Sequence, residues 1–138
     1  MNKLAIAATF AVGTALLSMP AADARTKLTG EQRLAKMLEG REAGEPVSCI
    51  PYSQTQDATV IDKTAIVYRV GATLYVNRPS NVDRLTDDDI LVTKLYGSQL
   101  CNNDTIQLRD RNVGGMWNGF LGLGEFVPYK KVKTADAR

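Results

Sequence analysis

The sequence predicts a small, mainly β domain of antiparallel strands, either barrel-like or a sandwich, with one amino-terminal helix packed on it. Between positions 47 and 129, short runs of β-branched and aromatic residues alternate with turn residues. Apolar residues at helical spacing occur before position 40, at Leu34, Met37 and Leu38. Three glycines in the last run suit a strongly bent sheet, which favours the barrel over the sandwich.

The first 24 of the 138 residues have the features of a cleavable export signal. Lys3 supplies a positive start, residues 4–17 are almost wholly apolar, and Ala22-Asp23-Ala24 offers small residues for cleavage. The apolar run is shorter than the roughly 20 residues that a membrane-spanning helix needs, so we expect no transmembrane anchor in the mature chain. An uncleaved anchor is the disfavoured alternative. Export places the mature protein in the bacterial periplasm or outside the cell.

The mature chain, residues 25–138, is long enough for one domain with a modest core. We expect the helix and a linker over 25–46, the β domain over 47–129, and a basic, disordered tail over 130–138. The formal net charge is +2, and it stays +2 after cleavage because Lys3 and Asp23 are removed together. So small a charge does not predict nucleic acid as a partner.

The helix is expected to follow Thr29, because Thr29-Gly30-Glu31-Gln32 has the form of a capping box. Leu34, Met37 and Leu38 lie at the spacing of one apolar stripe, and Gly40 is the expected carboxyl-terminal cap. The stripe predicts a helix lying over one face or open end of the sheet. The polar segment 40–46 has two glycines and a proline, which is typical of a linker.

The β domain has signals for at most seven strands. The clearest feature is a hairpin around Gly71-Ala72, where β-branched and aromatic residues flank a tight connection. Asp62-Lys63 indicates a turn just before it, so residues 58–77 should form a three-stranded meander. Pro128 should end the last strand, since proline cannot donate to a sheet ladder. The expected strands are 47–50, 58–61, 64–70, 73–77, 90–96, 105–109 and 119–127.

Cys49 and Cys101 are the two cysteines of the chain. In an oxidising compartment an intramolecular disulfide is the default expectation, and two cysteines allow only one such pairing. Closing a loop of this length would stabilise the fold by roughly 4 kcal/mol. The alternative is an intermolecular bridge or two free thiols.

Three motifs suggest a ligand, and each has a simpler structural explanation. Thr86-Asp87-Asp88-Asp89 lacks the spacing of a calcium loop, so we expect a capped turn. The lone Trp117 follows a glycine loop, as a ligand platform can, but a single tryptophan more often covers the core. The glycines of 119–127 are not placed between a strand and a helix, so they predict bulges or close backbone approach, not a phosphate loop.

The chain has no histidine, which excludes histidine-dependent nucleophilic catalysis and histidine-ligated metal sites. We therefore predict no catalytic, cofactor-binding or metal-binding residue. A carboxylate pair as in glycoside hydrolysis stays formally open, because its two members need only the right separation in space. The candidate carboxylates are Asp57, Asp62, Asp104, Asp110 and Glu125.

Three short motifs together resemble the DUF6491-like family of small exported bacterial proteins of unknown function. The motifs are Pro46-Val47-Ser48-Cys49-Ile50, Gly97-Ser98-Gln99-Leu100-Cys101-Asn102-Asn103-Asp104 and Leu123-Gly124-Glu125-Phe126-Val127-Pro128-Tyr129. The resemblance covers roughly residues 34–129 and implies export and a single cysteine-bearing domain, but no functional residues. Many relatives carry a second cysteine pair, near residues 82–85 and near residue 121, which this chain lacks. The resemblance thus implies that Cys49 and Cys101 pair with each other.

Two functions from different classes follow. The first is a non-catalytic periplasmic or secreted binding module, with a cell-envelope component as a candidate partner. The alternative is a carboxylate-based hydrolase acting on an envelope polysaccharide, which needs two partly exposed carboxyl groups within about 5–10 Å in one cleft. A weaker third hypothesis is that Lys130, Lys131 and Lys133 contact anionic lipid or polysaccharide, whereas a solvated tail is the simpler explanation.

Overall fold

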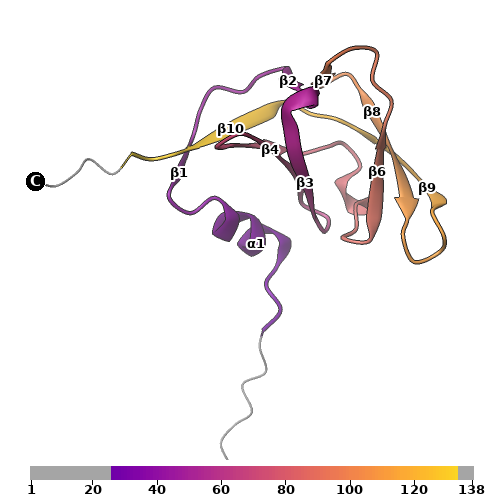
Figure 1. Ribbon diagram of the computed structural model, residues 1–138. Helices are drawn as coiled ribbons and strands as arrows, with labels where there is room; N and C mark the ends of the chain where they lie inside the picture. Colours follow the sequence, from indigo (N-terminus) through magenta and orange to yellow (C-terminus); the bar gives the residue numbers. More distant parts are fainter. Residues whose placement is uncertain (1–25, 134–138) are drawn as a thin grey trace, which may run out of the picture.

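The computed structural model describes residues 26–133, which form antiparallel sheets and one short helix (Figure 1). The predicted export signal, residues 1–24, and the end of the predicted tail lie outside the described residues. Among residues 26–133 the structure holds no helix that is long and apolar enough to cross a membrane. The predicted class, a mainly β domain with one amino-terminal helix, is confirmed.

The largest sheet joins the predicted meander to the last strand of the chain, in the order β1-β10-β5-β4-β3. Strands β3, β4 and β5 are consecutive and antiparallel, which confirms the meander. A two-residue turn connects β4 to β5, and Gly71 in this turn has a φ of +58°, the conformation that such hairpins need. The bounds are β1 Arg41–Ala43, β3 Thr55–Ile61, β4 Ala65–Val70, β5 Thr73–Asn77 and β10 Phe126–Lys131.

The last strand does not end at Pro128, as the sequence suggested, but continues to Lys131 and pairs with β1. Strand β1 lies in the segment that was expected to be a linker. The Pro128 carbonyl accepts a hydrogen bond from the Gly44 N–H at 2.7 Å. The N–H and C=O of a strand residue point to the same side of the strand. Because the Pro128 carbonyl faces Gly44 and not β5, the N–H that proline lacks would also have faced away from β5. Pro128 therefore costs no β10–β5 hydrogen bond.

Two smaller sheets complete the domain. One has the order β6-β8-β9, and the other pairs β2 with β7. The described residues thus contain ten strands where at most seven were predicted. Strands β1 and β7 have only three residues each, which is too short for a recognisable alternating pattern. The single strand predicted at 119–127 corresponds to parts of two strands, β9 and β10. The bounds are β2 Cys49–Pro51, β6 Asp89–Thr93, β7 Gln99–Cys101, β8 Thr105–Asp110 and β9 Met116–Gly122.

Two apolar cores lie on opposite faces of β4. Ile66 and Tyr68 belong to the inner core, which the sheets enclose, whereas Ala65 and Val67 belong to the core beneath the helix. The helix α1 (Gly30–Met37) places Leu34 in the second core, as its apolar stripe predicts (Figure 1). The inner core also contains Ile50, Leu85, Leu100, Ile106, Leu108, Leu121, Leu123 and Phe126.

The predicted start of the helix is confirmed and its predicted end is slightly displaced. Thr29 Oγ1 accepts from the Gln32 N–H at 3.2 Å, and Gln32 Oε1 accepts from the Thr29 N–H at 2.9 Å, which completes the capping box. Leu38, not Gly40, is the carboxyl-terminal cap. Gly40 follows two residues later with a φ of +70°, where the chain turns into β1.

The sheets curl around the inner core without closing into a barrel in residues 26–133. On one side, the Ser80 N–H donates to the Gly122 carbonyl at 2.9 Å and ties β9 to the segment after β5. On the other side, β3 and β6 are each the last strand of their sheets and do not pair with one another. The barrel-like domain is therefore open between β3 and β6 (Figure 1).

Cys49 and Cys101 form the predicted disulfide. They are direct cross-strand partners in the β2–β7 pair, with Cα atoms 4.0 Å apart. Adjacent residues Ile50 and Leu100 lie fully buried in the inner core. The bond therefore joins two three-residue strands that are far apart in sequence and lie side by side at one end of the open barrel (Figure 1).

The glycines near the end of the chain have the structural roles that the sequence predicted. Gly119 lies at a bulge in β9 and has a φ of +119°. At Gly124 an added Cβ would come within 2.7 Å of the Arg78 carbonyl oxygen, so the backbones approach too closely for a side chain. Buried Asn77 holds this approach, because its amide group bonds to both the carbonyl and the N–H of Gly124.

Candidate functional site

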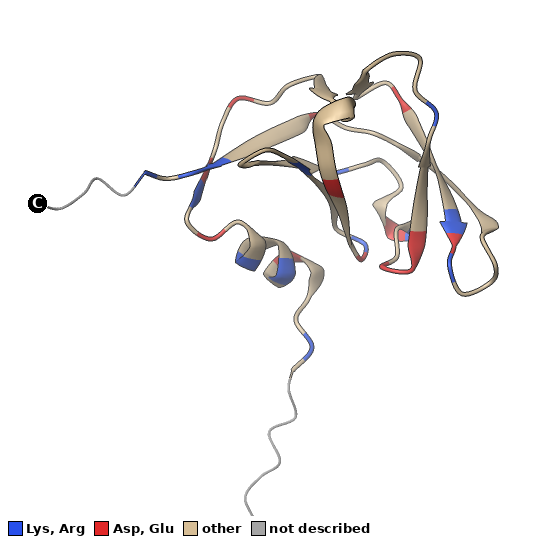
Figure 2. Cartoon of the chain, viewed as in Figure 1, with Lys and Arg blue, Asp and Glu red and all other residues tan. Residues whose placement is uncertain are grey.

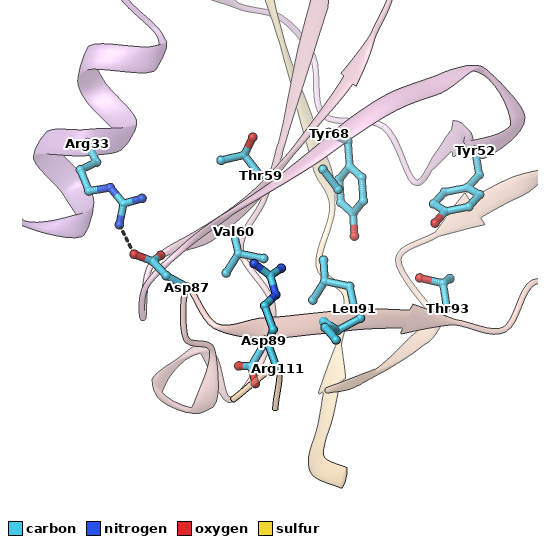
Figure 3. Close-up of a pocket in the computed structure, with 12 residues that line it drawn as sticks. Arg33, Tyr52, Thr59, Val60, Tyr68, Asp87, Asp89, Leu91, Thr93 and Arg111 are labelled. Carbon is cyan, nitrogen blue, oxygen red and sulfur yellow. Dashed lines mark hydrogen bonds and ion pairs between the residues drawn. The ribbon is translucent and has the colours of Figure 1, made fainter. Parts of the chain in front are cut away.

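The opening between β3 and β6 is a cleft of about 470 Å³ (Figure 3). We call it the β3–β6 cleft. One wall comes from the middle of β3, the opposite wall comes from β6, and Tyr68 of β4 reaches it from the inner core. Its volume lies within the range of protein ligand sites. The lining residues are Arg33, Tyr52, Ala58, Thr59, Val60, Tyr68, Asp87, Asp89, Ile90, Leu91, Thr93 and Arg111.

Tyr68 is the most unusual group in the cleft. Its side chain is 1% exposed, and its ring packs edge-on against Phe126 with centroids 5.8 Å apart. The hydroxyl points into the β3–β6 cleft and has no hydrogen-bond partner (Figure 3). Burial raises the pKa of this phenol, and the nearby Tyr52 raises it further, so the hydroxyl stays protonated. A buried hydroxyl without a partner costs about 1–3 kcal/mol, so Tyr68 has an unsatisfied donor at the base of the cleft.

The end of the cleft near the helix is charged. Asp87 accepts hydrogen bonds from the Arg33 side chain and, at 2.8 Å, from the Asp62 N–H. These bonds connect the helix, the β3–β4 turn and the turn before β6. Figure 2 shows acidic residues at the start of β6 and in the turn before it.

Asp89 is the second carboxylate of the cleft, and it is 3% exposed. Its oxygens accept from the Thr86 N–H at 2.8 Å and from Asn118 Nδ2 at 2.9 Å. Asp89 thus caps the Thr86 N–H as predicted, whereas Thr86 takes part through its main chain, whose carbonyl accepts from the Asp89 N–H at 3.0 Å. In residues 26–133 no three histidine, cysteine, aspartate or glutamate side chains gather as metal ligands would.

The structure does not bring the carboxylates selected from the sequence together in the cleft. Asp104 and Asp110 cap local backbone donors, the Cys101 N–H and the Asn112 N–H, each at 2.7 Å. The remaining candidates are Asp57, exposed on β3, Asp62, in the β3–β4 turn, and Glu125, exposed between β9 and β10. The carboxylates that do line the cleft, Asp87 and Asp89, both hold structural hydrogen bonds.

The prediction that Trp117 covers the core is wrong. Its side chain is 58% exposed, and its ring meets the exposed Phe120 edge-on at 5.5 Å between centroids. Buried Gly119 and Leu121 alternate along β9, and this pattern would place Trp117 inside as well. The bulge adds one residue to β9, so Trp117 pairs with exposed Arg109 and turns outward.

The β3–β6 cleft itself was not predicted. Tyr68 stands in the apolar run of a buried strand, and nothing in that run shows that its hydroxyl lacks a partner. One sequence signal was available, because a tyrosine at a core-facing strand position needs a partner for its hydroxyl. Whether the fold supplies a hydrogen-bond partner for this hydroxyl depends on which strands lie next to β4 and β3, and local sequence does not show this.

No family model, no curated protein and no solved structure matches this chain. The resemblance to the DUF6491-like family therefore stays a prediction from three short motifs.

Proposed function

We propose that the exported chain is a non-catalytic binding module of the periplasm or the cell exterior, and that its ligand occupies the β3–β6 cleft. The buried, unpartnered hydroxyl of Tyr68 carries this proposal. Folding leaves this donor without an acceptor, and a ligand with a polar atom in the cleft supplies one. The carboxylates beside it serve structural hydrogen bonds, so recognition is favoured over acid–base chemistry.

Titration of the ¹⁵N-labelled protein with defined envelope components tests the proposal. The probes are muropeptides, envelope oligosaccharides, single amino acids and a mixture of random heptapeptides. We expect one class to shift amide resonances of β3 and β6 around the cleft. Tyr68→Phe should weaken that binding about tenfold, the effect of one lost hydrogen bond of roughly 1.4 kcal/mol.

Trp117→Ala is the matched control, because it removes an aromatic side chain outside the cleft lining. It should leave the affinity unchanged. Shifts confined to the exposed face of β9 would contradict a ligand site in the cleft, and so would a panel in which no probe perturbs β3 or β6.

The proposed location has a separate test. The export signal and the disulfide support a periplasmic or extracellular protein, because disulfides persist in oxidising compartments. Fractionation of the producing cells should recover a chain that begins at Arg25 outside the cytoplasm. Recovery of the uncut chain from the cytoplasm would contradict it.

A further inference from the structure

The β3 wall of the cleft presents main-chain groups that no other part of residues 26–133 uses. Val70 and Thr73 flank the two-residue turn between β4 and β5, so they form a hydrogen-bonded pair. Successive residues of a strand direct their N–H and C=O groups to opposite sides. Val67 therefore bonds to Thr59 of β3. The N–H and C=O groups of Ala58 and Val60 consequently point away from β4, toward the cleft.

The β6 wall presents a matching set. The Arg111 N–H donates to the Asp88 carbonyl at 3.1 Å, which extends the β6–β8 ladder by one hydrogen-bonded pair. Every second residue from Asp88 then points its N–H and C=O groups toward β8, which includes residues 90 and 92. Those of Leu91 and Thr93 face the cleft, and both residues line it.

The spacing of these groups matches that of an extended polypeptide. Along either wall the free donors and acceptors recur every second residue, about 6.6–6.8 Å apart. A peptide in β conformation offers its own N–H and C=O groups at that same repeat on both sides. Sugars and single amino acids have no such two-sided repeat.

We propose that the ligand is an extended segment of a different protein, which inserts between β3 and β6 as an added strand. This proposal rests on the binding function proposed above. Three to five residues span the free groups of both walls, since each strand residue advances roughly 3.3 Å. Alternate side chains of the segment point toward the inner core, where the Tyr68 hydroxyl meets a polar one. Insertion pairs both exposed edges and completes the barrel.

Selection from a random heptapeptide library with blocked termini tests the proposal. We expect peptides that bind with a dissociation constant below about 1 mM. Hydrogen exchange of the Ala58, Val60, Leu91 and Thr93 amides should slow at least about tenfold in the complex. The Thr59 and Val92 amides, already bonded within their sheets, should change little. Unchanged exchange at the four cleft amides would overturn the proposal.

A variant of β3 separates main-chain pairing from other contacts. Ala58→Pro removes the N–H that faces the cleft and leaves the β3–β4 ladder intact, because proline is tolerated at such edge positions. It should weaken peptide binding about tenfold, and Ala58→Ser, which keeps the N–H, should bind like the parent. Equal binding by the proline and serine variants would overturn strand addition.

The same pairing can be tested from the peptide side, whether or not the proline variant folds. N-methylation at either set of alternate peptide positions should weaken binding, because one set of N–H groups pairs with β3 and the other with β6. Tolerance of methylation at every position would overturn the proposal. Exchange protection that appears without peptide and grows with protein concentration would show that a second copy fills the cleft, which also overturns it.

The two proposals can fail separately. If an oligosaccharide or muropeptide shifts the cleft amides and no heptapeptide binds, the cleft is a binding site but not a strand acceptor. If no probe of any class shifts the cleft, both proposals are wrong.

Discussion

Two aromatic residues show how burial separates structural from functional roles in this domain. Tyr68 sits in the inner core, but its hydroxyl has no partner there. Trp117, by contrast, has a large apolar side chain that is mostly exposed to solvent because a one-residue bulge in β9 turns it outward. For both residues the side chain alone does not predict the environment, because hydrogen-bond partners and strand register depend on the rest of the fold.

Tyr68→Phe should leave the free protein equally stable or stabilise it by up to about 2 kcal/mol. The substitution keeps the ring contact with Phe126 and removes only the unsatisfied hydroxyl, whose burial costs about 1–3 kcal/mol. Urea denaturation of both proteins measures the difference. A loss of more than about 1 kcal/mol would mean that the hydroxyl has a partner in the free protein.

Trp117→Ala should change the free energy of unfolding by no more than about 1 kcal/mol, well below the 3–5 kcal/mol typical of a buried tryptophan. Because Trp117 is the only tryptophan, its fluorescence should also be strongly quenched by acrylamide in the native state. Weak native-state quenching that increases only on unfolding would indicate a covered indole instead.

At the scale of elements, the helix packs on the large sheet through apolar side chains, and two ion pairs flank this contact. Arg33 bonds to Asp87 before β6, and Arg78, just after β5, bonds to both carboxylate oxygens of Glu31 at 2.7 and 3.0 Å. The hydrogen bond from Arg78 lowers the pKa of Glu31. Leu34 adds the apolar contact. The helix is therefore anchored by buried Leu34 and the partly buried Met37 and Leu38, with two partly exposed ion pairs beside them.

Glu31→Gln should destabilise the protein slightly at neutral pH, by at most about 1 kcal/mol, since exposed ion pairs contribute little. The folded-state pKa of Glu31 lies below its reference value of 4.5, so its contribution is present above pH 4.5. It is lost as pH falls through the folded-state pKa. Thermal melts of the two proteins should therefore converge in acid. A difference that grows below pH 4 would contradict this assignment.

At the scale of the whole molecule, the domain is an open barrel with a single covalent tie. The disulfide joins residues 52 positions apart at one end, and hydrogen bonds through Ser80 and Gly122 hold one side. The opposite side, between β3 and β6, has no ladder in the described chain. The β3–β6 cleft thus lies where the edge strands of two sheets are not paired with each other.

Removal of the disulfide should cost roughly 4 kcal/mol of stability, the loop-closure entropy for a separation of 52 residues. The double variant Cys49→Ala with Cys101→Ala, compared with the oxidised parent in urea, measures it. The β3–β6 cleft does not include either cysteine, so Tyr68 should keep its environment in the folded variant. A stability loss below about 1 kcal/mol would show that the β2–β7 pair holds without the bond.

Local sequence was enough for the parts whose signals are local. The capping box at Thr29, the hairpin at Gly71 and the meander around it follow from neighbouring residues and are found as predicted. The disulfide was predicted from two cysteines and an expected export signal, and the cysteine pair is found. Strands β1 and β7 could not be predicted, because three residues form a strand only when a partner from elsewhere in the chain pairs with them.

By itself, the sequence determined the β content, the single helix and the cysteine pair, since turn chemistry and side-chain alternation act over a few residues. Only the tertiary structure decided that β3 and β6 end their sheets facing one another, that Tyr68 reaches the gap between them and that a bulge turns Trp117 outward. The physical reason is that alternation determines which face of a strand a residue occupies. Which strand edges remain unpaired depends on the path of the whole chain.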